Sequence, residues 1–354
     1  MNANQQPLLS MPALVWSGPG QMEIEKVAVP APSPGEVLIE VSAAGICGSE
    51  LSGYLGQNSL RVPPLIMGHE FSGRVVAANR DTAVAPTLVP GRRVAINPLV
   101  GCGVCALCGA GLPNLCRQRR IIGAHCAGGF ARYVTVPAAQ CSPLPDRVSN
   151  VAGALAEPLA CAVRAVQHAQ WRQEEGALLI LGAGTIGLFC LAVARASGAH
   201  GTIVISDIVE ERLSVARAWG ATTAINGRNA DATQALRAML PDGAACVIDA
   251  VGADATRALA LQMVRPGGRA VYIGLHDERS PLAANYLVRQ EITIQGSFAY
   301  TPTDFAGALD LLASAAVVPS AVWVEERPLS MGAAAFAGLV DGSITVAKIV
   351  LTPE

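Results

Sequence analysis

Four cysteines lie within fifteen residues of this chain and have the spacing of a metal site. Cys102, Cys105 and Cys108 are separated by two residues each, and Cys116 follows after seven more. Four thiolates at tetrahedral positions complete the coordination of Zn²⁺ and leave no position for a substrate, so such a site is structural. An iron–sulfur cluster could use the same four thiolates, and idle thiols are the remaining alternative. We expect a structural zinc ion that substitutes for hydrophobic packing in this lobe.

A glycine-rich turn between a predicted strand and a predicted helix indicates a dinucleotide site. Gly182, Gly184 and Gly187 form the pattern G-x-G-x-x-G after an apolar run. These glycines allow a tight turn, a close approach of pyrophosphate and packing of the helix on the strand. Asp207 ends the next predicted strand, where a carboxylate binds the ribose hydroxyls and repels a 2′-phosphate, so we predict NAD. The alternative is a glycine turn that holds nothing, with Asp207 as a solvated strand end.

The segments around this turn alternate between strand and helix patterns. Helical patterns run from the glycine turn to about residue 197 and over residues 210–219, 231–240 and 254–264. The six strand candidates are residues 177–181, 202–208, 222–226, 245–252, 268–275 and 291–298. This alternation predicts an α/β fold with a doubly wound, parallel, six-stranded Rossmann sheet. The first half of the chain differs, because it reads as strands, such as residues 37–45 and 72–78, with no helix pattern of any length.

Composition and charge exclude several classes of protein. Hydrophobic residues make up 51% of the 354 residues and charged residues 15%, which excludes a largely disordered chain and favours two domains. The net charge of −2 gives no case for nucleic acid, and no apolar run is long enough for a membrane span. The segment MNANQQPLLS lacks the features of a signal peptide, and ten cysteines in such a chain indicate metal binding rather than disulfides. We expect a cytoplasmic protein.

Three further segments carry residue types that bind metals or catalyse reactions. Cys47 lies in G-I-C-G-S-E at the end of a predicted strand, and His69 and Glu70 lie in G-H-E before the next strand. Glu157 lies in E-P-L, where the first predicted domain gives way to the second. Each residue alone has an ordinary structural explanation, such as a small buried cysteine or the start of a helix. Their spacing in the sequence does not join them.

The motifs taken together resemble the zinc-containing medium-chain alcohol dehydrogenases, and within them the polyol (sorbitol-like) and sugar-alcohol-phosphate dehydrogenases. The resemblance rests on G-I-C-G-S-E, G-H-E-F-S-G, the four-cysteine lobe, E-P-L, G-A-G-T-I-G and V-A-K-I-V-L, which span nearly the whole chain. It implies a Rossmann domain over residues 159–299 that is inserted in a mostly β, partly open barrel-like catalytic domain over residues 1–158 and 300–354. It also implies a homodimer or homotetramer, for which the last Rossmann strand would offer a sheet edge.

The resemblance implies a second, catalytic zinc ion in addition to the structural one. Cys47, His69 and a carboxylate would hold it, with Glu70 and Glu157 taking turns as ligand with water. Such an ion keeps one coordination position open and makes a substrate hydroxyl more acidic. A secondary alcohol or polyol would then pass a hydride to NAD. Ser49 matches the proton-relay hydroxyl of the family, although a hydroxyl at this position could also serve only a turn.

The resemblance also places residues along the cofactor. Besides the glycines, Ile186, Asp207 and Arg212 are expected at its adenosine and pyrophosphate end, although an isolated arginine is by default a solvated surface residue. Val251 is a further candidate cofactor-binding residue. The residues expected toward the nicotinamide and the substrate are Ile273, Gly274, Leu275, Phe298, Ala299 and Tyr300.

Four positions depart from the pattern of the family, and one of them is Asn79, which occupies a usual glycine or alanine position. Glu50 stands where an aspartate usually contacts the zinc-ligand histidine, and Ser52 stands where many members carry a relay histidine. Ala299 replaces the arginine of sorbitol-type enzymes, which favours a more apolar alcohol, a diol or a differently anchored sugar alcohol. Two rival hypotheses are a sugar-alcohol-phosphate or amino-alcohol (threonine-type) dehydrogenase and a non-catalytic NAD-binding protein that carries only structural zinc.

Overall fold

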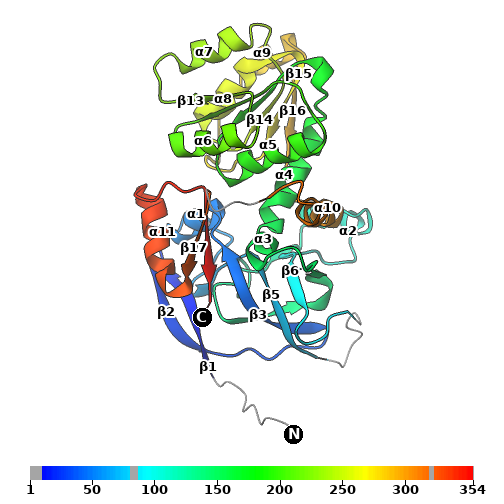
Figure 1. Cartoon of the computed structure of the whole chain (residues 1–354), viewed down its shortest axis with the longest axis vertical. Coiled ribbons are helices and arrows are strands. Elements are labelled where there is room, and N and C mark those ends of the chain that lie inside the picture. Colours follow the sequence, from blue (N-terminus) through cyan, green and yellow to red (C-terminus); the bar gives the residue numbers. More distant parts are fainter. Residues whose placement is uncertain (1–9, 80–86, 319–322, 354) are drawn as a thin grey trace. The chain divides into compact units, whose positions relative to one another are not determined.

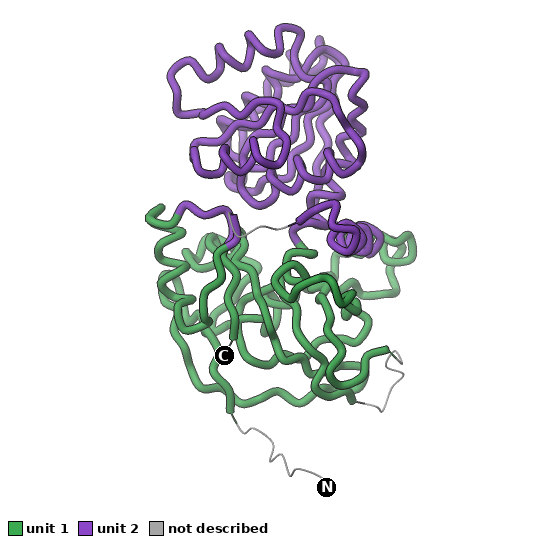
Figure 2. The backbone as a smooth tube through the Cα atoms, viewed as in Figure 1, with its two compact units in different colours: residues 1–157, 325–344, 349–354 green, residues 158–324, 345–348 purple. Residues whose placement is uncertain are grey.

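The computed structural model divides into two compact units (Figures 1 and 2). It describes residues 10–79, 87–318 and 323–353. Unit 1 comprises residues 1–157, 325–344 and 349–354, and unit 2 comprises residues 158–324 and 345–348. The expectation of a cytoplasmic protein used the segment MNANQQPLLS, and most of this segment lies outside the described residues. Within the described part of the chain, none of the helices combines the length and the apolar character that crossing a membrane requires.

The main sheet of unit 1 follows from alternating burial along its strands. Every second side chain of β3 (Glu36–Gly45) is buried until its last residues, which are all buried. The strand pairs antiparallel with β5 (Glu70–Ala78) on one side and with the C-terminal β18 (Lys348–Thr352) on the other. The remaining strands of this sheet are β6 (Arg93–Ile96), β9 (Tyr133–Pro137), β10 (Cys141–Pro143) and β17 (Val324–Pro328). The predicted strands over residues 37–45 and 72–78 are confirmed.

Two smaller sheets complete the β-structure of unit 1. A three-stranded sheet contains β1 (Ser10–Gly18), β2 (Gln21–Ala28) and β4 (Leu65–Ile66). A two-stranded sheet of β7 (Leu99–Val100) and β8 (Arg120–Ile121) flanks the four-cysteine lobe. The unit is therefore mostly β, as predicted.

The expectation that the first half of the chain holds no helix is wrong. The structure has α1 (Gly48–Tyr54), α2 (Ala106–Gly109) and α3 (Asn150–Ala154), and α4 (Ala156–Ala169) begins just before Glu157. The first three helices have seven residues or fewer, which is too short for an apolar repeat of 3.6 residues to show in the sequence. Unit 1 also holds α11 (Gly332–Asp341) near the C-terminus.

Unit 2 is built on a parallel six-stranded sheet in the order β13-β12-β11-β14-β15-β16. Its strands are β11 (Leu178–Leu181), β12 (Ile203–Asp207), β13 (Thr223–Asn226), β14 (Ala244–Asp249), β15 (Val264–Tyr272) and β16 (Thr293–Gly296). The helices that follow these strands are α5 (Thr185–Ala196), α6 (Glu210–Ala218), α7 (Ala232–Met239), α8 (Asp254–Met263) and α9 (Ala284–Arg289). The predicted Rossmann sheet is confirmed, and β16 lies at its edge as expected.

The division between the units differs from the expected one after residue 299. Residues 300–324, which include α10 (Pro302–Ala313), belong to unit 2 and not to the catalytic domain. Arg164 of α4 forms an ion pair with Asp304 of α10, with Nη1 and Oδ2 3.2 Å apart. The ring of Trp323 packs edge-on against Phe189 of α5, with centroids 5.1 Å apart. These contacts join elements that are distant in sequence, which a reading of strand and helix patterns does not reveal.

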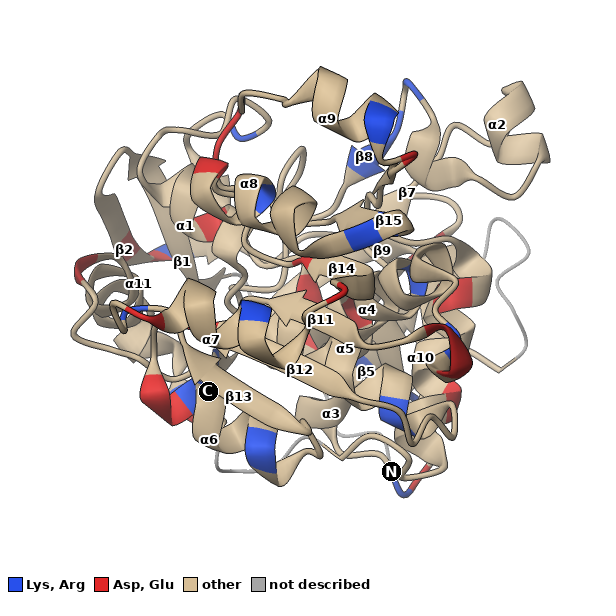
Figure 3. Ribbon diagram, turned by 90° about the horizontal axis from the view of Figure 1, so that it is seen from above, with Lys and Arg blue, Asp and Glu red and all other residues tan. Residues whose placement is uncertain are grey.

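Charged residues of both signs are interspersed along the elements of the two units (Figure 3). Some polar residues are buried instead, and the candidate site contains several of them.

Candidate functional site

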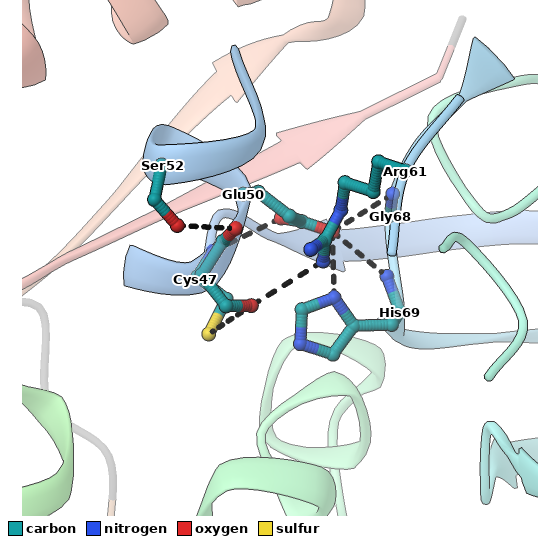
Figure 4. A network of polar contacts seen from close by, with 7 residues as sticks. Cys47, Glu50, Ser52, Arg61, Gly68 and His69 are labelled. Atoms are coloured by element: carbon teal, nitrogen blue, oxygen red, sulfur yellow. Dashed lines mark hydrogen bonds and ion pairs between the residues drawn. The ribbon is translucent and has the colours of Figure 1, made fainter. Parts of the chain in front are cut away.

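Three side chains that can bind a metal converge in unit 1. The ligand atoms of Cys47, His69 and Glu70 all lie within 4.8 Å of one another. Cys47 directly precedes α1, whereas His69 directly precedes β5 and Glu70 is the first residue of that strand. The side chains of Cys47 and His69 reach toward the same region in Figure 4. The structure thus brings together three of the four residues expected at the catalytic zinc ion.

The pairing of β3 with β5 leaves room for the carboxylate of this group. Gly45 lies opposite Glu70 in the register of the two strands. A Cβ atom at Gly45 would overlap Glu70 Oε2, so only glycine fits there while Glu70 keeps this position. Glu70 is only 1% exposed, and a buried carboxylate requires compensating partners. One thiol, one imidazole and one carboxylate form a donor set that suits Zn²⁺.

Glu157 is not a member of this closely spaced group. It lies in the first turn of α4 and is 8% exposed. The expected alternation of Glu70 and Glu157 as metal ligands therefore remains a prediction, with Glu70 placed among the ligand atoms in this structure.

Glu50 connects the two segments that carry the ligands. Its carboxylate accepts the backbone N–H groups of Cys47, Gly68 and His69 at 3.0, 2.9 and 3.1 Å. Its Oε1 atom also lies 2.7 Å from His69 Nδ1, which leaves Nε2 as the ring nitrogen for a metal. Despite its additional methylene group, Glu50 reaches the histidine as the aspartate of the family would.

The charges in this network act against the effects of burial. Burial alone would raise the pKa of Glu50, but the neighbouring His69, Arg61 and the Cys47 N–H group bring it below its ordinary value. Burial would lower the pKa of His69, but Glu50 and Cys47 raise it well above its ordinary value. The carboxylate and the thiol thus favour positive charge at the imidazole, and a bound cation would benefit from the same two groups.

Two serines of α1 take different roles beside the ligands. Ser49 Oγ donates a hydrogen bond to Cys47 Sγ at 3.5 Å and accepts one from Arg61 Nη2 at 3.3 Å. Ser52 Oγ donates to the Ser49 carbonyl oxygen at 3.0 Å, a bond within the helix. The sequence analysis did not identify Arg61, because it lies in a loop and no motif or period marks it.

The four-cysteine lobe has the geometry of a metal site. The sulfur atoms of Cys102, Cys105, Cys108 and Cys116 lie within 4.8 Å of one another, and those of Cys102 and Cys108 are 3.9 Å apart. A Cβ atom at Gly101 would lie 2.8 Å from Cys108 Sγ, so the turn at Gly101 fits closely around that thiol. All ten cysteines are free thiols. The arrangement agrees with the expected tetrahedral site.

The thiols of the lobe also differ in acidity. Hydrogen bonds from the backbone N–H groups of Val104 and Cys105 lower the pKa of Cys102 to about 6. A hydrogen bond from the Gly103 backbone acts in the same direction on Cys108, but desolvation and the neighbouring thiols raise its pKa to about 11. The backbone N–H groups thus favour the thiolate form of Cys102, which is the form that binds a metal.

The glycine turn of unit 2 has the geometry of a phosphate-binding turn. Gly182 has φ +95°, and a Cβ atom at Gly187 would overlap the Gly182 carbonyl oxygen. Gly184 is the N-cap of α5, and the position of its missing Cβ faces open space. Asp207 accepts the backbone N–H groups of Ala183 at 2.5 Å and Val209 at 2.8 Å. The turn and the carboxylate therefore lie at the same edge of the sheet.

The remaining cofactor candidates of unit 2 differ in their contacts and exposure. Ile186 lies in α5 and is half-buried, whereas the Arg212 Nε–H group donates to the Thr345 carbonyl oxygen at 3.1 Å. Val251 packs closely on Gly182, because a Cβ atom there would lie 2.6 Å from Val251 Cγ2. Leu275 is 75% exposed.

Asp249, which the sequence analysis missed, organises this region. Its Oδ1 atom accepts the N–H groups of Val251 and Gly252, both at 3.0 Å. Its carbonyl oxygen accepts those of Ile273 and Gly274 at 3.1 and 3.0 Å. Asp249 ends the buried strand β14 as Asp207 ends β12, and the interpretation of the sequence used this signal for Asp207 only, because Asp207 follows the glycine pattern by twenty residues.

The segment expected near the substrate has mixed exposure. Ala299 has φ +49°, a left-handed conformation that side chains rarely adopt. Phe298 is half-buried, whereas Tyr300 is 1% exposed and packs against Phe305 with ring centroids 5.7 Å apart. The placement of these residues does not test their expected contact with a cofactor or substrate.

Comparisons with known families identify two domains in this chain. Residues 33–146 match the family model described as the alcohol dehydrogenase GroES-like domain. Residues 185–314 match the one described as zinc-binding dehydrogenase.

Relatives and solved structures agree with these matches. The chain is 35% identical to the probable D-xylulose reductase A of Aspergillus clavatus, over 86% of this chain and 87% of the relative. It is 30% identical to L-galactonate-5-dehydrogenase of Escherichia coli K12, over 91% and 93% of the two chains. The crystal structure of rspB from E. coli CFT073, in complex with NADH, superposes with a TM-score of 0.88 at 29% identity and covers 97% of this chain and 99% of the other.

Proposed function

Because this chain belongs to the zinc-containing medium-chain dehydrogenases, we propose that Cys47, His69 and a buried glutamate hold the zinc ion at which it oxidises its substrate. The protein is an oxidoreductase that uses zinc and a nicotinamide cofactor and acts on alcohols or polyols. The observation that supports the site is the convergence of a thiol, an imidazole and a carboxylate within 4.8 Å. Glu70 is the proposed carboxylate ligand in this arrangement, and Glu157 is the proposed alternate.

The residues of the site have different roles in the proposed alcohol oxidation. A zinc ion supplies a Lewis acid that makes the substrate hydroxyl more acidic, and NAD supplies the hydride acceptor. Ser49 receives the proton of the substrate hydroxyl and passes its own proton on. Glu50 fixes the ring of His69 and the backbone of Cys47, so that the ligands are held before the metal binds.

The proposed preference for NAD rests on Asp207. Its carboxylate is held at the end of β12 by the N–H groups of Ala183 and Val209. Each carboxylate oxygen keeps a further lone pair, so both can still accept ribose hydroxyls. A 2′-phosphate at the same place would meet an uncompensated negative charge, which disfavours NADP.

The second proposed metal is a structural zinc ion in the four-cysteine lobe. Its four thiols leave no open coordination position, so it would stabilise the lobe and take no part in the reaction. This proposal sets the zinc content at two ions per chain. It also supports a cytoplasmic location, because the four thiols must stay reduced.

The proposed substrate class is a secondary alcohol or polyol that is not anchored as sorbitol is. Ala299 offers no charged donor where sorbitol-type members of the family place an arginine. A hydroxyl-rich substrate would therefore need another polar partner, and a more apolar alcohol or a diol would not. We further propose a homodimer or homotetramer, in which the exposed edge of β16 offers a surface for pairing.

A direct assay tests the proposed function. The purified protein is incubated with NAD and a panel of secondary alcohols, polyols and polyol phosphates, and NADH formation is followed by absorbance. At least one non-phosphorylated alcohol should be oxidised, and Cys47→Ala should abolish this turnover while NAD binding and the melting curve remain. Wild-type turnover by Cys47→Ala, or no oxidation of any alcohol by protein that holds two zinc ions, would refute the proposal. Light scattering of the same sample tests the oligomeric state.

A further inference from the structure

Arg61 is a buried arginine beside the proposed catalytic residues of unit 1. It is 6% exposed, and its guanidinium group lies next to Glu50 in Figure 4. Its Nη2 atom donates to Ser49 Oγ at 3.3 Å. The Nε atom is buried and has no hydrogen-bond partner in the described part of the chain. A guanidinium group that is buried with incomplete hydrogen bonding is costly, which calls for an explanation.

We propose that Arg61 is a positioning residue for the reaction: its hydrogen bond fixes the direction of the Ser49 hydroxyl and keeps a positive charge beside it during proton transfer. This inference rests on the proposed function and deepens it, because it assigns a task to a residue that the resemblance does not cover. Arg61 itself does not touch the reacting atoms in this proposal.

The hydrogen-bonding capacities of the two groups set the direction of the hydroxyl. A guanidinium group has five donors and no acceptor, so Ser49 Oγ must accept in its contact with Arg61. The one hydrogen of Ser49 then points away from Arg61, and its observed acceptor is Cys47 Sγ at 3.5 Å. Ser49 therefore presents its hydroxyl to the metal-ligand side and keeps one lone pair for a substrate hydroxyl.

The proton balance explains why a cation is useful at this place. As the proton of a substrate hydroxyl arrives at Ser49 Oγ, the original Ser49 proton leaves to water, so one O–H bond of Ser49 forms while the other breaks. Negative charge develops on that oxygen when the departure runs ahead of the arrival. The guanidinium group of Arg61 has donors and no acceptor, so it does not take up the proton. Its fixed charge, donated through an N–H group, stabilises the charge that develops on Ser49 Oγ.

Ser52 does not take this role in the structure. The position where many family members have a relay histidine is occupied by this serine, whose hydroxyl donates to the Ser49 carbonyl oxygen at 3.0 Å. That contact serves the backbone of α1. Among the described residues, Arg61 is the ionised side chain with a hydrogen bond to the Ser49 hydroxyl.

Gly53 of α1 makes room for the arginine. A Cβ atom at Gly53 would lie 2.6 Å from Arg61 Cδ, so the arginine side chain would have to shift. The neighbouring Met67 sulfur would remain at an ordinary contact distance of 3.7 Å. Alanine is favoured over glycine inside a helix. Gly53→Ala should therefore displace the guanidinium group without removing its charge or weakening the helix.

A double-mutant cycle with Ser49→Ala tests the proposal in the zinc-loaded enzyme. Arg61→Met should lower kcat about tenfold or more and increase the solvent deuterium isotope effect on kcat, with zinc content and the Kd of NADH unchanged. Arg61→Lys should restore part of the loss because it keeps the charge, and Gly53→Ala should show a smaller loss of the same kind. In the Ser49→Ala background, Arg61→Met should change kcat by less than about twofold, because the partner is gone. Arg74→Met, which removes an exposed arginine of β5, is the matched control.

A spectroscopic measurement separates this inference from the proposed function. In cobalt-substituted protein, the thiolate-to-metal absorption band should shift in Arg61→Met and Gly53→Ala, since both disturb the donor to Cys47, and stay unchanged in Arg74→Met. An equal loss of kcat from Arg61→Met in both Ser49 backgrounds, or an unshifted band, would overturn the proposal. If no alcohol is oxidised but the band shifts, the proposed function fails while the Arg61–Ser49–Cys47 contact stands, and the catalytic part of the inference falls with the function.

Discussion

Glu50 Oε1 lies 2.7 Å from His69 Nδ1, and the same oxygen accepts the backbone N–H groups of His69 and its neighbour Gly68. The other carboxylate oxygen accepts the N–H group of Cys47. One side chain therefore sets the ring orientation of one ligand and the backbone of another. This arrangement gives the metal site rigidity before any metal binds, since the two strand ends that carry the ligands share one buried carboxylate.

Glu50→Gln should weaken the catalytic zinc site. The amide keeps the shape of the side chain, but it cannot accept at both of its terminal atoms, so the contact to His69 or to Cys47 is lost. Loss of such a partner typically lowers metal affinity by about 10–100-fold. Competition with a chromophoric chelator measures this change, and Glu50→Asp, which restores the usual family residue, should retain most of the affinity. An unchanged affinity in Glu50→Gln would contradict the role assigned to this carboxylate.

Cys105→Ala should remove the structural zinc ion and lower thermal stability. The elements around its thiols are short, namely α2, the 3-10 helix η1 (Pro113–Leu115) and the two-stranded β7–β8 sheet, so little packing would replace the metal. Each kcal/mol by which the free energy of unfolding decreases lowers Tm by roughly 2–4 °C for a unit of this size. Metal analysis should give one zinc ion per chain in place of two. Cys141→Ala, outside the lobe, is the control, and equal melting curves for Cys105→Ala and the wild type would argue against a structural metal.

Asp207→Ala should weaken NAD binding and reduce the discrimination against NADP. The substitution removes an acceptor for the ribose hydroxyls and the charge that repels a 2′-phosphate. Hydrogen bonds to a charged group contribute about 1.5–3 kcal/mol, so the Kd of NAD should rise by roughly 10–100-fold. Quenching of protein fluorescence by each cofactor measures the two affinities.

A second substitution separates charge from architecture at this position. Asp207 also accepts the N–H groups of Ala183 and Val209, so alanine disturbs the glycine turn as well. Asp207→Asn keeps one acceptor and removes the charge, and it should improve NADP binding more than it harms NAD binding. The exposed Asp231 serves as control when changed to alanine. An unaltered preference for NAD in both Asp207 variants would count against the ribose assignment.

The sequence predicted the local patterns of this protein well. The strands of unit 2, the edge position of β16 and the convergence of the four lobe cysteines follow from signals within short stretches of chain. The grouping of Cys47 with His69 and Glu70 followed only from the resemblance, because the register of β3 with β5 decides it and no spacing rule encodes that register.

The features that were missed depend on tertiary contacts. Helix α1 is too short to show a period, and its start depends on Glu50 reaching back to the N–H group of Cys47. Arg61 lies in a loop, and its side chain passes close to Gly53 of α1. Residues 300–324 belong to unit 2 because of the Arg164–Asp304 ion pair and related contacts. Such contacts join residues separated by tens of positions, so no local pattern could indicate them.

Asp249 should make the stability of the protein depend on pH in a direction opposite to that of most carboxylates. Burial raises the pKa of Asp249 above its ordinary value of 3.8, and the hydrogen bonds from Gly252, Val251 and Thr256 offset this only in part. The folded state therefore holds this proton at a pH where the unfolded state has released it. The contribution of Asp249 to stability is thus largest below about pH 4 and is lost as the pH rises through the folded-state pKa.

Asp249→Asn isolates this contribution, because the amide stays neutral at every pH. Its Oδ1 atom can still accept from Val251 and Gly252, and the Thr256 hydroxyl can turn to accept from the amide group. Denaturant unfolding of the wild type and the variant should show that the wild type loses stability relative to Asp249→Asn as the pH rises from about 4 to 7. A constant difference between the two proteins over this range, or a relative gain of the wild type with rising pH, would show that burial does not control this carboxyl group.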